Sequence, residues 1–172
     1  LQARFLAFGS DPSVVGCRFE GNTAASLGGA MYSERSAGEF RDCVFELNLA
    51  PEGGAAYCDE SSESICGCHF DLNAAELRGG GLYVEAGGQP TVVSSTFSNN
   101  RATDAGADGG AIALIGSRAT VIGSLFFANE SGSSGNGGAI YASGSTVASF
   151  TNCTWSGNLS PFSGAAIYAR NT

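Results

Sequence analysis

The chain has 172 residues, a length typical of one domain, and it contains 26 Gly but only 4 Pro. Its formal net charge is −8 and all eight basic residues are Arg, which argues against nucleic-acid binding because phosphates require a basic surface. No apolar run reaches the roughly 18 residues of a membrane span, and residues 1–4 lack the charged-then-apolar build of a signal peptide.

Two short phrases alternate along the chain. One is an aromatic residue followed three positions later by Asn, and the other is Gly-Gly followed by small and apolar residues, as in residues 28–31. The aromatic residues are Phe19, Phe45, Phe70, Phe97, Phe126 and Trp155, and the partner residues are Asn22, Asn48, Asn73, Asn100, Asn129 and Asn158. Successive aromatic residues lie 25 to 29 positions apart, a period typical of solenoids.

In chain order, residues 1–12 are expected to be the second half of a preceding repeat, because Phe5 stands nine residues before Val14 as Met31 does before Phe40. Each later unit then carries a β-rich segment, the aromatic residue, the Asn, a polar loop and the Gly-Gly phrase. The apolar segments are short and broken by Gly, so we expect strands of about four to five residues and no helix.

A single coil of this kind cannot bury its apolar side, but coils stacked at about 4.8 Å place like residues on like. Parallel strands joined by crossovers are right-handed in about 98% of cases. The sequence therefore predicts an all-β fold, a right-handed parallel β-helix (β-solenoid) of about six coils of 25–29 residues, with residues 1–172 as one domain. Both ends fall within a repeat, so we expect a segment of a longer repeat protein.

The Asn column is predicted to be structural. An Asn tolerates the left-handed backbone of a sharp corner, and stacked amides can hydrogen-bond from coil to coil. The aromatic and Asn columns together are therefore expected to form ladders inside the solenoid. The variable loops follow the Asn residues, and they are longest after Asn100 (residues 101–108) and Asn129 (residues 130–136). Insertions of this kind mark the binding side of a solenoid.

Cys58 and Cys66 lie outside the repeat pattern and flank an acidic turn. A disulfide between them would indicate an oxidising, extracytoplasmic setting, and the spacing leaves open whether they are paired or free. The other cysteines share an inward register and are expected to be apolar fillers.

Three acidic residues, Glu20, Glu46 and Asp71, each follow the aromatic residue directly and should face outward on adjacent coils. Stacked like charges repel one another, and calcium could relieve this repulsion because it prefers several carboxylate oxygens. We favour the alternative, a solvated acidic stripe compensated by Arg18 and Arg41, and expect no other cofactor.

No residues are assigned a catalytic role. The sole histidine, His69, should face outward, and no Ser or Cys nucleophile stands at a recognisable spacing. If the chain were a carbohydrate-active enzyme, its only clustered candidates would be Glu46 and Asp71 with Arg18 and Arg41.

The pairing of Phe-x-x-Asn with Gly-Gly-Ala-Ile resembles the repeats of the polymorphic outer membrane proteins. The resemblance covers almost the whole chain, although Gly81, Ala56 and Trp155 depart from the pattern. It is carried by Phe19 and Asn22 with residues 28–31, Phe45 and Asn48 with residues 53–56, Phe97 and Asn100 with residues 109–112, and Phe126 and Asn129 with residues 137–140. It implies a surface-exposed or secreted passenger that acts in adhesion.

The function we expect is therefore a non-enzymatic segment of a secreted or cell-surface protein, an adhesin-like or structural scaffold that binds in its corner loops. Its partner would be a host or matrix protein or a polysaccharide. Two alternatives stay open: a β-helix of the polysaccharide lyase or glycoside hydrolase type, and a self-assembling filament or oligomer subunit that associates through its open coil ends.

Overall fold

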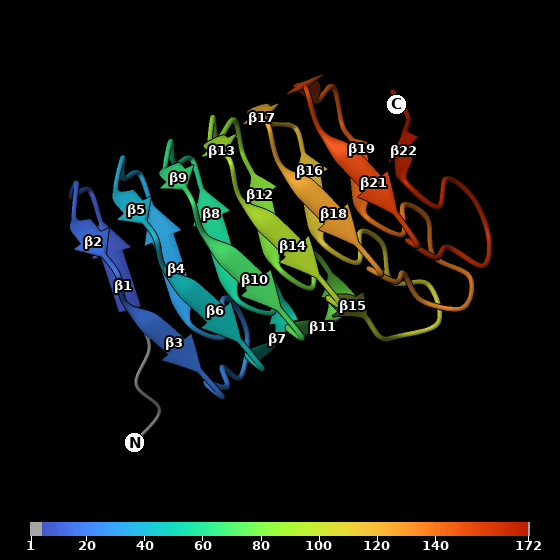
Figure 1. Ribbon diagram of the computed structural model, residues 1–172, viewed down its shortest axis with the longest axis horizontal. Helices are drawn as coiled ribbons and strands as arrows, with labels where there is room; N and C mark the ends of the chain where they lie inside the picture. Colours follow the sequence, from blue (N-terminus) through green and yellow to red (C-terminus); the bar gives the residue numbers. More distant parts are fainter. Residues whose placement is uncertain (1–4, 172) are drawn as a thin grey trace.

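The computed structural model describes residues 5–171. Within that range the regular elements are all strands, and the coils follow one another along the long axis of a rod from the N-terminus to the C-terminus (Figure 1). The all-β parallel solenoid predicted from the repeat is confirmed, with about six coils.

The strands form four sheets that run along the rod, and neighbouring strands in each sheet are parallel. Sheet A consists of β1 (Phe5–Phe8), β4 (Met31–Glu34), β8 (Ala56–Asp59), β12 (Leu82–Glu85), β16 (Ile112–Ile115), β19 (Ile140–Ser143) and β22 (Ile167–Ala169). Sheet B consists of β2 (Ser13–Val15), β5 (Glu39–Arg41), β9 (Ser64–Cys66), β13 (Thr91–Val93), β17 (Arg118–Ile122) and β20 (Val147–Thr151).

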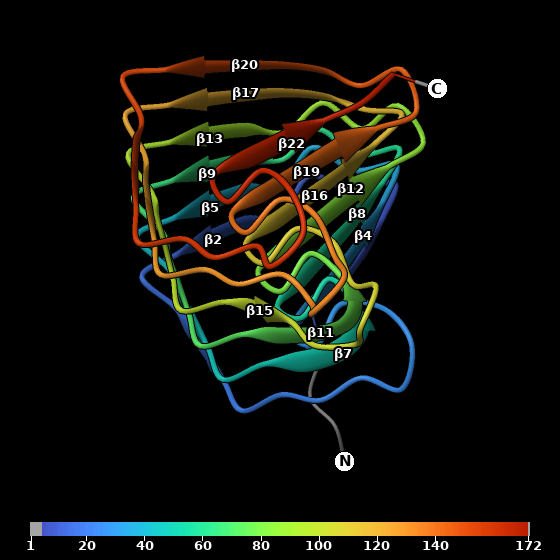
Figure 2. The same cartoon turned by 90° about the vertical axis from the view of Figure 1, so that its right-hand side faces the viewer.

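Sheet C consists of β3 (Arg18–Glu20), β6 (Val44–Glu46), β10 (His69–Asp71), β14 (Thr96–Ser98), β18 (Leu125–Phe127) and β21 (Thr154–Ser156). The short sheet D consists of β7 (Leu49–Glu52), β11 (Ala74–Arg78) and β15 (Arg101–Ala102). Figure 2 looks along the rod and shows sheet B on one side, sheet D on the opposite side and the strands of sheet A running obliquely between them.

The aromatic ladder lies inside the solenoid as predicted. From Phe19 to Trp155, the ring centroids of consecutive members are 4.5 to 5.8 Å apart and their planes are within 10° of parallel. Phe45, Phe70, Phe97 and Phe126 are fully buried. One residue type repeated once per coil therefore produces a continuous core.

The Gly-Gly phrase is required by close backbone contact at the corner before each strand of sheet A. Gly79 has a φ of +64°, a conformation that favours glycine, and a Cβ on Gly80 would lie 2.3 Å from the carbonyl oxygen of Gly110 in the next coil. The two glycines thus allow the turn and the approach of one coil to the next.

The corner at the Asn ladder differs in one respect from the expectation. The left-handed residue is the one before each Asn, and not the Asn itself: Leu47, Leu72, Asn99 and Ala128 have φ values between 53° and 56°. The ladder Asn residues are selected by their side-chain hydrogen bonds instead.

Candidate functional site

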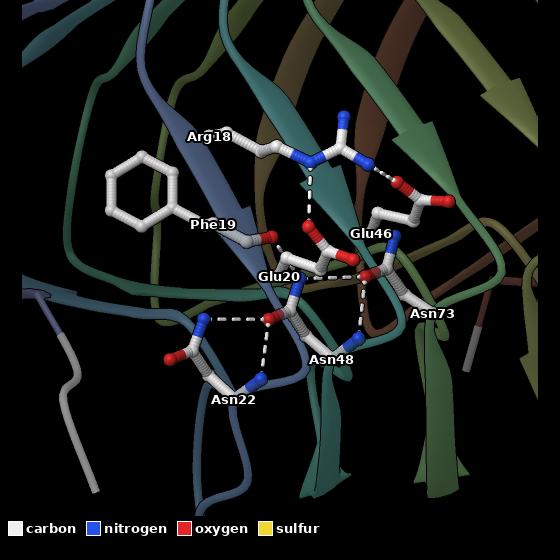
Figure 3. A network of polar contacts seen from close by, with 7 residues as sticks. All are labelled: Arg18, Phe19, Glu20, Asn22, Glu46, Asn48 and Asn73. Carbon is white, nitrogen blue, oxygen red and sulfur yellow. Dashed lines mark hydrogen bonds and ion pairs between the residues drawn. The ribbon is translucent and has the colours of Figure 1, made fainter.

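The Asn ladder is a continuous internal chain of hydrogen bonds (Figure 3). The Nδ2 of Asn48 donates to the Oδ1 of Asn73 at 2.9 Å and to the carbonyl oxygen of Phe19 at 2.9 Å, and the Oδ1 of Asn73 also accepts the backbone N–H of Asn48. The same pattern continues through Asn100, Asn129 and Asn158. Asn48, Asn73, Asn100 and Asn129 are fully buried, so this predicted column holds the corner together and is not available to a ligand.

The acidic column lies on the outer face of sheet C, where Glu20, Glu46 and Asp71 occupy one register on adjacent coils. Arg18 compensates two of them: its Nε lies 2.7 Å from Oε2 of Glu20, and its Nη2 pairs with Glu46 (Figure 3). The carboxylate of Asp71 accepts hydrogen bonds from Ser98 Oγ at 2.6 Å and from Asn99 Nδ2 at 2.9 Å. Each member thus has a partner within the chain.

Among residues 5–171, no three His, Cys, Asp or Glu side chains are grouped so that they could hold a metal ion. The ion pairs of Arg18 instead relieve the repulsion for which calcium was considered. Calcium binding at Glu20, Glu46 and Asp71 stays a prediction.

The residues considered for a carbohydrate-active enzyme do not form one cluster. Arg41 pairs with Glu39 on sheet B, whereas Arg18, Glu46 and Asp71 lie on sheet C with the partners given above. His69 is exposed on β10, as its register predicted.

Cys58 and Cys66 are free thiols in the structure. Cys58 is fully buried in β8, and Cys66 is partly exposed in β9, one residue after the buried Ile65. Since side chains alternate along a strand, Cys58 points into the solenoid and Cys66 points away from it, which explains why the considered disulfide is not formed. Burial raises the pKa of Cys58 well above its ordinary value and that of Cys68 to about 12, as suits inert core thiols.

A buried carboxyl group that the sequence analysis missed lies between sheets A and B. Glu63 is fully buried, its Oε1 accepts a hydrogen bond from Ser33 Oγ, and its Oε2 has no hydrogen-bond partner among the described residues. Burial is the main cause that raises its pKa. The sequence contained a sign that Glu63 is unusual. The equivalent positions in neighbouring coils are occupied by Pro12, Gly38 and Pro90, which carry no charge.

The two long corner loops stack on each other. The backbone N–H of Gly132 donates to the carbonyl oxygen of Ala107 at 2.9 Å, and the Oδ1 of Asp108 accepts the backbone N–H of Asn136 at 2.7 Å. The residues at the tips of these loops are exposed, whereas Asp108 is buried. The loops therefore form one ordered projection at the corner beside sheet D.

The first loop also arches over the preceding coil. Its residues Asp104 and Asp108 donate their backbone N–H groups to the carbonyl oxygens of Glu76 and Leu77 in β11, at 2.9 and 3.1 Å. The corner after Asn73 has three residues fewer, so the segment between these two anchors stands out from the rod. A half-open cleft of about 300 Å³ lies there, lined by Leu77, Arg78, Asp104, Gly106 and Ala107.

A family model for the right-handed beta helix region matches residues 3–126. No curated protein and no solved structure matches the chain. Among the described residues there is no helix long and apolar enough to cross a membrane.

Proposed function

The chain belongs to the right-handed β-helix family, and on that basis we propose that it is a non-enzymatic scaffold segment of a secreted or cell-surface protein. In this proposal the stacked coils hold the corner loops rigidly away from the rod. The loops of residues 101–108 and 130–136 then bind an extracellular partner.

The observation that carries the proposal is the ordered projection made by these two loops. Loops on a rigid scaffold are the usual place of binding, and preorganised loops lose little entropy when they bind. The resemblance of the repeat to polymorphic outer membrane proteins supports an adhesive role for such a projection. The acidic residues of sheet C are engaged in ion pairs and hydrogen bonds, which favours a structural role for that face.

The test is a loop replacement. A variant in which residues 101–108 and 130–136 are each replaced by the sequence of residues 74–78 keeps the rod but removes the projection. Retention on immobilised matrix proteins and polysaccharides should be lost in this variant and kept in Arg118→Gln, an exposed position on β17 of sheet B, on the side of the rod opposite sheet D (Figure 2).

Undiminished retention of the loop variant would contradict the proposal. Cleavage of any polysaccharide in the panel would favour the lyase or hydrolase class instead. Association that depends on protein concentration, measured by sedimentation, would favour the filament alternative.

A further inference from the structure

The cleft under the arch contains an arginine whose hydrogen-bonding capacity is unused. The guanidinium of Arg78 is partly exposed, its nearest carboxylate oxygen is Oε1 of Glu52 at 3.8 Å, and it makes no hydrogen bond to any described residue. By contrast, Arg18 and Arg101 approach carboxylates at 2.7 and 3.0 Å. Arg78 therefore offers several N–H donors toward the cleft.

Asp104 supplies acceptors at the same cleft. Its backbone is fixed by the hydrogen bond to Glu76, while its carboxylate makes no side-chain hydrogen bond or ion pair with the described residues. Leu77, which is 46% exposed, adds apolar surface to the lining of the same cleft, and the buried Ala107 also belongs to the lining. Donor, acceptor and apolar surface are thus arranged around one small space.

The charges near the cleft decide between possible ligands. Among the residues that line the cleft, Arg78 carries the single positive charge and Asp104 a negative one, and the carboxylate of Glu52 lies 3.8 Å from Arg78. The local net charge is negative, so an anionic ligand would meet repulsion, whereas a neutral ligand rich in hydroxyl groups could accept from Arg78 and donate to Asp104. The volume of about 300 Å³ lies at the lower end of the range for small-molecule sites.

We propose that this cleft binds one unit of a neutral saccharide, with hydroxyl groups held by Arg78 and Asp104 and the sugar ring against Leu77. This inference rests on the proposed binding role of the corner and adds its ligand class. The first of the two long loops supplies the arch and the acceptor, and β11 supplies the floor and the donor.

The experiment measures binding of neutral oligosaccharides, namely maltohexaose, cellohexaose and mannohexaose, by calorimetry with the whole chain, and uses oligogalacturonate as the acidic probe. Arg78→Gln and Asp104→Ala should each weaken binding of the preferred neutral oligosaccharide at least about tenfold, because hydrogen bonds to charged groups are lost. The matched control is Arg118→Gln, which should bind as the unchanged protein does. Thermal melting verifies that each variant is folded.

Each other outcome overturns the inference. Equal or tighter binding of oligogalacturonate would contradict the charge argument, and neutral binding that survives in both cleft variants would place the ligand elsewhere. If no oligosaccharide binds, the saccharide cleft is wrong. In all three cases the loop-replacement experiment on matrix proteins still tests the proposed scaffold role independently.

Discussion

Asn73 shows how many groups depend on one side chain in a solenoid. Its Oδ1 accepts two hydrogen bonds from Asn48. Its Nδ2 donates to the carbonyl oxygen of Phe45 in the preceding coil and to the Oδ1 of Asn100 in the following coil, and all four distances are 2.9 or 3.0 Å. All of these groups are buried, so they have no access to water when the side chain is removed.

We expect Asn73→Ala to lower the free energy of unfolding by at least about 3 kcal/mol, because buried amide and carbonyl groups left without partners cost about 1–3 kcal/mol each. Asn158→Ala should cost less, since this last member of the ladder is only half-buried. Urea denaturation measures both. If both substitutions lowered the free energy of unfolding by the same small amount, the Asn ladder would not be a source of stability.

Glu63 is the residue at which stability should depend on pH. Its pKa is raised in the folded protein by burial, so between the unfolded and the folded pKa the native state binds more protons than the unfolded chain. The contribution of Glu63 to the free energy of unfolding is therefore fully present below the unfolded pKa and is lost as pH rises through the folded pKa.

We expect Glu63→Gln, which cannot ionise, to be more stable than the unchanged protein at pH 8 and no more stable at pH 4. Burial also raises the pKa of Glu52 and Asp59, but their effect is common to both proteins and cancels in the comparison. Melting temperatures measured across this pH range provide the test. A constant difference between the two proteins would mean that Glu63 does not titrate there.

At the scale of the elements, the corners carry most of the local constraint. The left-handed column before the Asn ladder is occupied by Gly21, Leu47, Leu72, Asn99, Ala128 and Gly157. Gly and Asn suit this conformation, whereas Leu at the same φ is strained. The strands themselves are only two to five residues long, so the sheets depend on these corners for their register.

Leu72→Asn should therefore raise the free energy of unfolding by about 1 kcal/mol, because Asn tolerates a left-handed conformation that costs other residues about 1–2 kcal/mol. Leu72 has a φ of 55° and is 46% exposed, so little apolar burial is lost. Leu77→Asn is a matched control, equally exposed but without a positive φ, and it should not stabilise. Thermal melting measures both variants. If both are stabilised, the cause would be the removal of an exposed apolar side chain and not relief of the left-handed backbone conformation.

At the scale of the whole molecule, residues 5–171 form a rod in which the strands of each coil pair with the equivalent strands of the coils before and after it (Figure 1). The charge of the chain is uneven along the length: residues 1–86 contain thirteen acidic residues and five Arg, and residues 87–172 contain three of each. The projecting loops belong to the neutral half, while the cleft lies where the two halves meet.

Because stability in such a rod is nearly a sum over neighbouring coils, one coil should be removable in phase. Deletion of residues 74–100 joins Asn73 to Arg101 and would place Phe70 next to Phe126, so we expect a folded protein whose urea m-value is smaller by roughly a sixth. Deletion of residues 74–87 removes half a coil and should abolish folding. Circular dichroism and urea titration distinguish these outcomes, and a folded out-of-phase variant would contradict the ladder description.

The sequence by itself determined the solenoid, its aromatic and Asn ladders and the outward position of Glu20, Glu46 and Asp71. These features repeat with the coil, and a side chain that recurs once per period stacks on its equivalents whatever the rest of the coil does. The same logic gave the outward position of His69 on β10.

Only the tertiary structure decided the features that depend on what lies beside a residue in another sheet or coil. Tyr57 and Tyr83 point out of sheet A yet are nearly fully buried, because they stack in one column with Tyr32 and belong to a second cluster that includes Ala113, Ile115 and the corner residue Leu27. Glu63 lies inside because its corner turns it toward Ser33, and the arch over β11 exists because one coil has a longer corner than the coil before it. The repeat specifies each column, whereas contacts between unequal coils are not periodic and arise only in the folded rod.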